Sequence, residues 1–192
     1  MAFSGTAASA ADGTLLVFGD SLSAAYGLDA SQGWVSLLQK RLLERGYGLK
    51  VVNASVSGET THGGRSRLAR ALDQHHPRIV ILELGANDGL RGLPLAAARD
   101  NLAAMISVIQ GAKGRVVLVG VQLPPNYGMA YTSRFRALYT ELARSHHTAL
   151  VPFLMEGVAL DPALMQADGL HPNAAGQPRL LDNVWTALKP LL

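Results

Sequence analysis

The stretch Gly19-Asp20-Ser21-Leu22-Ser23 closes the first apolar run of the chain, residues 15–18. That run is short enough for one buried strand, and the glycine ends it. Asp20 and Ser21 then stand where a parallel strand meets its first loop. Ligands of open α/β sheets bind at this position, outside the carboxyl ends of the strands. The alternative for this stretch alone is an Asx or Ser turn that leads toward a helix.

Apolar runs and helix-length amphipathic segments alternate along the rest of the chain. The expected strands are residues 15–18, 49–53, 79–84, 116–120 and 149–153. The expected helices are residues 34–45, 64–74, 96–110, 131–144 and 173–189. Continuous apolar strands separated by helices predict a parallel sheet covered on both faces. With right-handed crossovers this is a three-layer α/β/α sandwich, and the small polar residues after each strand gather at one edge.

Composition narrows the classes of protein to consider. The 192 residues carry a net charge of +3 without a basic run, so we expect no nucleic-acid partner. No apolar run approaches the roughly 20 residues of a membrane-spanning helix. The absence of Cys excludes disulfides, thiolate metal sites and cysteine nucleophiles. No repeat, linker or shift in composition divides residues 13–192, which we expect to form a single domain.

Residues 1–12 are excluded from the predicted fold because they are small and polar. Within them, Ala8-Ser9-Ala10 has the A-x-A form of a signal-peptidase site, although a basic n-region and a long apolar h-region are missing. This favours the remnant of a signal peptide and a periplasmic or secreted protein. A disordered Ala/Ser/Gly tail is the alternative, and a cytoplasmic location stays open.

Ser21 needs a base before its hydroxyl can act as a nucleophile. His171 follows the fifth expected strand, in a loop on the Ser21 edge, and Asp168 precedes it across a turn made by Gly169. An Asp that holds one ring nitrogen leaves the other free to take the serine proton. The alternative for this stretch alone is a turn that caps the last helix. The remaining histidines fit an exposed helix start or helix ends at the opposite edge: His62, His75, His76, His146 and His147.

Two further loops carry residues that could stabilise a developing oxyanion. Gly58 can bring a backbone N–H close because it lacks Cβ, and Asn87 can offer a side-chain amide. The alternatives are a turn glycine and an Asx turn. Asp20 and Asp88 could also indicate a cation site, but no further carboxylate cluster supports it.

Four blocks in order carry a family resemblance: GDSLS at 19–23, SGET with Gly58, GANDG with Asn87, and DGLHP at 168–172. Together they resemble the SGNH (GDSL) hydrolases, most closely the bacterial thioesterase I/lysophospholipase L1 (arylesterase) branch. The resemblance covers about residues 14–192. The GxSxG motif is absent, which argues against an ordinary α/β-hydrolase.

The resemblance implies roles for the matching residues. Ser21 would be the nucleophile, His171 the base and Asp168 its orienting partner. The Ser21 and Gly58 N–H groups and the Asn87 side chain would form the oxyanion hole. It also implies a flavodoxin-like sheet of order 2-1-3-4-5 and no metal or other cofactor. The implied substrates are acyl-CoA-like thioesters, aryl esters and lysophospholipids.

The sequence therefore predicts a serine hydrolase, expected to be a monomer, that cleaves small acyl esters and thioesters through an acyl-enzyme. An apolar groove could hold the acyl chain; its candidate residues are Leu90, Leu93, Pro124, Pro125 and Met129. A carbohydrate acetylesterase of the same superfamily is one alternative. A non-catalytic binding module is another, which the intact set of polar residues disfavours. A nucleotide-binding switch protein lacks GxGxxG and a Walker lysine loop.

Overall fold

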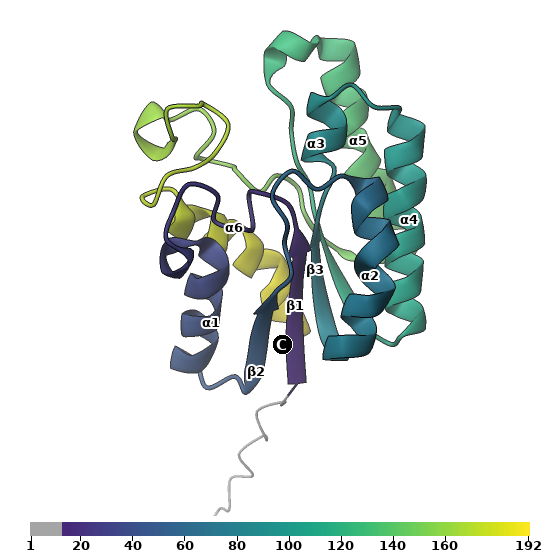
Figure 1. The fold of residues 1–192 in the computed structure, drawn as a ribbon, viewed down its shortest axis with the longest axis vertical. Coiled ribbons are helices and arrows are strands. Elements are labelled where there is room, and N and C mark those ends of the chain that lie inside the picture. The colour runs from purple at the N-terminus through teal and green to yellow at the C-terminus, as the bar shows by residue number, and fades with distance from the viewer. Residues whose placement is uncertain (1–12) are drawn as a thin grey trace, which may run out of the picture.

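The fold is a five-stranded parallel sheet between two layers of helices, seen in a computed structural model that describes residues 13–192 (Figure 1). The A-x-A stretch at 8–10 lies outside the described residues. The strands are β1 (Gly13–Gly19), β2 (Leu49–Asn53), β3 (Pro77–Glu83), β4 (Arg115–Val119) and β5 (Ala149–Val151). Their order is β2-β1-β3-β4-β5, which confirms the predicted α/β class and topology.

Helices cover both faces of this sheet. On one face α1 (Trp34–Glu44) packs against α6 (Gln177–Leu188); on the other α4 (Leu95–Gly111) lies between α2 (Thr61–His75) and α5 (Met129–His146) (Figure 1). A short helix, α3 (Ala86–Leu90), and three 3₁₀ turns interrupt the connections: η1 (Ala30–Gln32), η2 (Pro125–Tyr127) and η3 (Pro162–Leu164). A fourth turn, η4 (Lys189–Leu191), follows α6. Within residues 13–192 no helix is long and apolar enough to cross a membrane.

The central strands are buried on both faces, as their continuous apolar sequences predict. In β1 the side chains from Leu15 to Phe18 are fully buried, and β3 pairs with them in parallel register, Val17 opposite Ile81. The helices complete the core with large side chains such as Trp34 and Phe135. Because β1 lies between β2 and β3, the loop after it opens inside the carboxyl edge and not at its outer margin.

Two predicted helix starts and one predicted loop are wrong for local reasons. Helix α2 begins at Thr61, because the Thr60 side chain caps it by accepting from the Gly63 N–H at 3.2 Å. Helix α6 begins only at Gln177, because the Asn173 carboxamide instead holds a turn through the N–H groups of Ala175 and Gly176. The GANDG stretch, expected as a loop, forms the single helical turn α3.

Candidate active site

The turn after β1 presents Ser21 at the carboxyl edge. The Asp20 side chain, fully buried, accepts the Leu22 N–H at 3.0 Å and so closes an Asx turn across Ser21. The Asp20 carbonyl accepts the Ala24 N–H at 2.9 Å. Ser21 is thereby held on a rigid turn while its side chain stays partly exposed.

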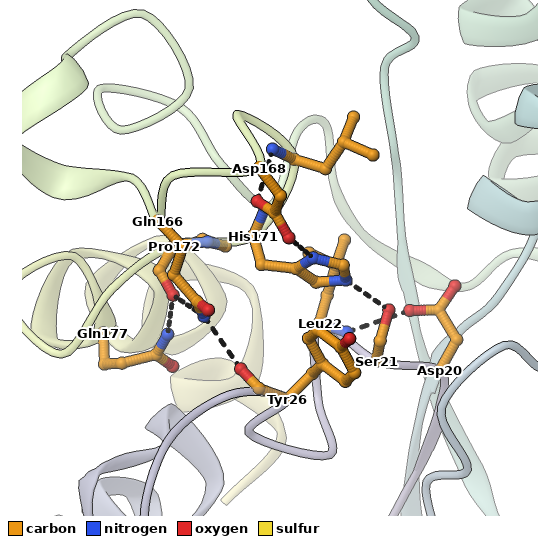
Figure 2. Close-up of polar contacts among 10 residues, drawn as sticks. Asp20, Ser21, Leu22, Tyr26, Gln166, Asp168, His171, Pro172 and Gln177 are labelled. Carbon is orange, nitrogen blue, oxygen red and sulfur yellow. Dashed lines mark hydrogen bonds and ion pairs between the residues drawn. The ribbon is translucent and has the colours of Figure 1, made fainter.

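His171 reaches the serine from the other end of the chain (Figure 2). Its Nε2 lies 2.8 Å from Ser21 Oγ, and its Nδ1 lies 2.6 Å from Asp168 Oδ2. Since an ionised carboxylate can only accept, the ring proton is assigned to Nδ1, and Nε2 is then the acceptor for the serine hydroxyl. The structure thus brings together the three residues predicted as nucleophile, base and orienting group.

The turn between Asp168 and His171 sets this geometry. Asp168 Oδ1 accepts the N–H groups of Leu170 and His171 at 2.9 and 3.0 Å, while Oδ2 is left for the ring. Gly169 makes the turn at φ +65°, a conformation that costs a glycine little. Partial burial raises the pKa of Asp168, but the hydrogen bonds from the His171 N–H and ring and from the Leu170 N–H outweigh it and lower the pKa to about 2. Asp168 is therefore a carboxylate at neutral pH.

The three predicted oxyanion donors face the same space. Ser21, Gly58 and Asn87 all line one cleft with His171. Neither the Ser21 nor the Gly58 N–H donates to another of the described residues. Asn87 Nδ2 donates to Asp20 Oδ2 at 3.1 Å, which leaves its second N–H for another acceptor. Arg91 donates to the Gly58 carbonyl at 3.0 Å and ties the Gly58 loop to the segment after α3.

The cleft has a volume of about 940 Å³. Of the predicted acyl-groove residues, Leu90, Pro124 and Pro125 line it, whereas Leu93 and Met129 do not. A second group of lining residues, not predicted from the sequence, forms the opposite wall and is also largely apolar: Phe153, Met155, Ala159, Leu160, Met165 and Leu170. These residues follow β5, and their place after a strand was the available signal.

Two other neighbours of the histidine were also missed. The Tyr26 ring lies 4.6 Å from the His171 ring, centroid to centroid, with the two ring planes tilted by 38°. Gln166 Nε2 donates to the carbonyls of Tyr26 and Pro172 at 2.8 and 3.0 Å, and so joins the serine loop to the histidine loop (Figure 2). No sequence signal marks either residue, since both contacts join segments far apart in the chain.

Asp20 and Asp88, considered above as a cation site, each bind protein groups instead. Asp88 accepts from the Thr61 N–H at 2.8 Å and from its hydroxyl at 2.6 Å. Across the part of the chain that the structure describes, no group of three or more His, Asp or Glu residues could hold a metal ion.

The remaining histidines lie away from the cleft. His62 is exposed on the first turn of α2. His76 and His147 are the C-caps of α2 and α5, next to His75 and His146 in the last turns of those helices. His171 is thus the histidine in contact with Ser21.

Comparison with known proteins identifies the family. The sequence pattern of the GDSL-like lipase/acylhydrolase family matches residues 17–179. Esterase TesA of Pseudomonas aeruginosa is 55% identical over 183 residues, covering 95% of this chain and 91% of TesA. The chain belongs to the GDSL-like lipase/acylhydrolase family. Thioesterase 1/protease 1/lysophospholipase L1 of Escherichia coli K12 is 43% identical over 185 residues, covering 96% of this chain and 87% of that protein.

A crystal structure of TesA shares the fold, with a TM-score of 0.92 and 55% identity; 93% of this chain and 99% of that one are covered. The five residues predicted for the triad and the oxyanion hole lie inside the segment that matches the GDSL-like lipase/acylhydrolase family: Ser21, Gly58, Asn87, Asp168 and His171. This protein is accordingly an acyl hydrolase, as the resemblance led us to expect.

Proposed function

We propose that this protein cleaves acyl esters and acyl thioesters through an acyl-enzyme on Ser21. The observation that carries the proposal is the continuous chain of contacts from Asp168 through His171 to Ser21, at 2.6 and 2.8 Å, in the wall of an apolar cleft. Such a chain has the parts that nucleophilic acyl transfer requires: a nucleophile, a base and an orienting carboxylate.

In the first half-reaction, Ser21 Oγ attacks the acyl carbonyl as His171 Nε2 takes the hydroxyl proton. The carbonyl oxygen becomes an oxyanion, which the N–H groups of Ser21 and Gly58 and the Asn87 amide are placed to stabilise. His171 then gives its proton to the leaving alcohol or thiol as that bond breaks. In the second half-reaction, His171 activates a water, and the acid leaves as Ser21 recovers its proton.

The volume and the apolar lining of the cleft favour substrates whose acyl chain is longer than acetyl. The cleft volume lies within the roughly 300–1,000 Å³ of small-molecule sites, and apolar side chains form both walls. Burial of a chain stabilises the complex by about 0.8 kcal/mol for each CH₂ group removed from water. The names of the relatives agree with such substrates, since one is an esterase and another a thioesterase and lysophospholipase.

A panel of p-nitrophenyl esters and acyl-CoA thioesters from acetyl to palmitoyl tests this proposal, with Ser21→Ala as the matched control. We expect kcat/KM to rise with chain length beyond acetyl in both series, and to fall to background in the control. A maximum at acetyl would favour the carbohydrate acetylesterase alternative. No turnover of any ester or thioester would contradict the proposed function.

Export and oligomeric state are further parts of this proposal. We propose a periplasmic or secreted monomer, on the basis of Ala8-Ser9-Ala10 and of a site built by residues of one chain. Cell fractionation and light scattering on the purified protein test the two statements separately.

A further inference from the structure

Two fully buried carboxyl groups lie beneath Ser21 and take no part in the reaction just described. Asp20 follows the end of β1, and Glu83 is the last residue of β3, opposite Gly19 in the parallel register. Both side chains are completely inaccessible to solvent. Since burying a charged group is costly, a pair of acids at this depth calls for a physical reason.

The Glu83 side chain bonds to the serine turn on both sides of Ser21 in the sequence, at Asp20 and at Ser23. Its Oε2 accepts the Ser23 hydroxyl at 2.7 Å and the Asp20 N–H at 3.3 Å. The approach is close: a Cβ on Gly19 would lie 2.6 Å from Oε2, so the backbone can pass there only because residue 19 is glycine. The other oxygen, Oε1, has no hydrogen-bond partner among the described residues.

Asp20 links the same turn to the oxyanion side chain. Its Oδ1 accepts the Leu22 N–H across Ser21, while its Oδ2 accepts from Asn87 Nδ2. The second bond fixes the rotation of the Asn87 amide, because a carboxylate can accept a hydrogen bond from the amide NH₂ group but not from the amide oxygen. The nucleophile turn and the Asn87 donor are therefore joined through one side chain.

The surroundings raise the pKa of both acids. Burial, and then the negative charge of Asp20, raise the pKa of Glu83 well above its ordinary value. Burial also raises the pKa of Asp20, to about 6, although the Leu22 N–H, the Asn87 amide and the charge of His171 lower it, and Asp88 adds a smaller upward effect. Burial, and then the charges of the nearby acids, also raise the pKa of Tyr139, a further titratable group beside the pair. Burial thus favours the uncharged form of both acids.

We propose that Asp20 and Glu83 are positioning residues, which hold the Ser21 turn and the Asn87 amide in one fixed arrangement. The inference rests on the proposed function and names two residues outside the triad and the oxyanion hole. It implies that Asp20 contributes to turnover through Asn87, and that Glu83 contributes through its shape and acceptor oxygen without needing a charge.

Asp20→Asn, Asn87→Ala and the double variant form the first test, with p-nitrophenyl butyrate as substrate. We expect Asp20→Asn to lower kcat roughly 10- to 100-fold while KM changes by less than about threefold. In the double variant the two losses should not multiply, because the second change removes a donor that has already lost its orientation. Independent, multiplying losses would overturn the link through Asn87.

Glu83→Gln and Glu83→Ala form the second test. Glutamine keeps the shape and one acceptor oxygen, so we expect kcat at pH 7 within about threefold of the unmodified enzyme; alanine should lose roughly 10-fold or more. Equal losses in both would contradict a role of Glu83 through its shape and acceptor oxygen. Ser23→Ala, a milder change that removes one contact to Oε2, should lower kcat roughly three- to tenfold at constant KM. Unchanged kcat in both Ser23→Ala and Asp20→Asn would overturn the proposal.

Asp88→Asn is the matched control, because Asp88 is another buried acid at this edge but bonds to Thr61 and not to the serine turn. We expect a lower Tm with kcat nearly unchanged. A loss of kcat equal to that of Asp20→Asn would show that the effect is not specific to the acids that bond to the serine turn, and would contradict the inference. The unmodified enzyme and Ser21→Ala, measured alongside, separate this inference from the proposed function: an inactive unmodified enzyme would refute the function itself.

Discussion

Ser21 and His171 stand 150 positions apart in the chain, yet Ser21 Oγ and His171 Nε2 lie 2.8 Å apart. The first follows β1 and the second follows β5, two strands of one parallel sheet that are not neighbours. Parallel strands place all their carboxyl ends at one edge, so the loop from β5 can reach back over the centre of the sheet. Most of the predictions below depend on this meeting of distant loops.

The first prediction concerns the nucleophile. A fluorophosphonate probe should label Ser21 covalently, because His171 is within hydrogen-bond distance to take its proton. Ser21→Ala should abolish both labelling and turnover, as shown by intact-mass spectrometry and ester hydrolysis. Activity retained in that variant would refute the serine mechanism.

The Asp168–His171 contact predicts an order of activities. His171→Ala removes the base, whereas Asp168→Asn leaves the base present but poorly oriented, and a loss of about 10⁴ in kcat is known for such a change elsewhere. We expect kcat to fall from the unmodified enzyme to Asp168→Asn and further to His171→Ala. Circular dichroism should show both variants folded. Unchanged turnover in either one would mean that the DGLHP stretch is simply a cap of the last helix.

Asp168 should also affect stability in a pH-dependent way. Its pKa is lowered to about 2 by the hydrogen bonds that it accepts, against an ordinary value of 3.8. A carboxyl group whose pKa is lower in the folded than in the unfolded protein stabilises the fold at pH values above its unfolded-state pKa. This stabilisation is lost as the pH falls through its folded-state pKa. The stability difference between the unmodified protein and Asp168→Asn, from urea unfolding, should be constant above about pH 5 and shrink toward pH 2. A difference that does not change with pH would contradict the contact.

The Asn87 prediction separates transition-state stabilisation from folding. Removing one oxyanion donor elsewhere costs ~10²–10³ in kcat, or roughly 3–4 kcal/mol. We expect that loss in Asn87→Ala with KM changed by less than about fivefold, because the bond strengthens as charge develops. Asn87→Ala also removes the hydrogen bond to the buried Asp20 carboxylate, so Tm should fall modestly while the fold is retained. A lower Tm with normal kcat would leave Asn87 a purely structural role.

Chelation provides an independent test of the chemistry. The proposed mechanism assigns every proton transfer and charge to protein side chains and backbone N–H groups. We therefore expect exhaustive EDTA treatment to leave ester hydrolysis unchanged, measured against an untreated sample from the same preparation. Activity lost on treatment and restored by Zn²⁺, Mg²⁺ or Ca²⁺ would indicate a metallohydrolase.

Local signals in the sequence were sufficient for the strands and for most helices. The run of residues 79–84 and the glycine at 46 mark their elements directly, and the observed β3 and α1 lie within two residues of the expected bounds. Where side chains compete with the backbone for hydrogen bonds, as Asn173 does, periodicity alone placed the boundary wrongly. The helical turn at Asn87 was missed because five residues are too few to show a helical period.

The sequence by itself determined the order of strands and helices, the sheet edge that carries the polar loops, and the residues of the triad and oxyanion hole as candidates. These follow from periodicity, from turn residues and from motif order, all of which are local in the chain. The tertiary structure alone decided the distances among them, the opposite wall of the cleft, the packing of Tyr26 on His171, and the burial of Asp20 and Glu83 beneath Ser21. The physical reason is that burial, hydrogen-bond partners and pKa shifts depend on neighbours from distant segments, which come together when the helices pack on the sheet.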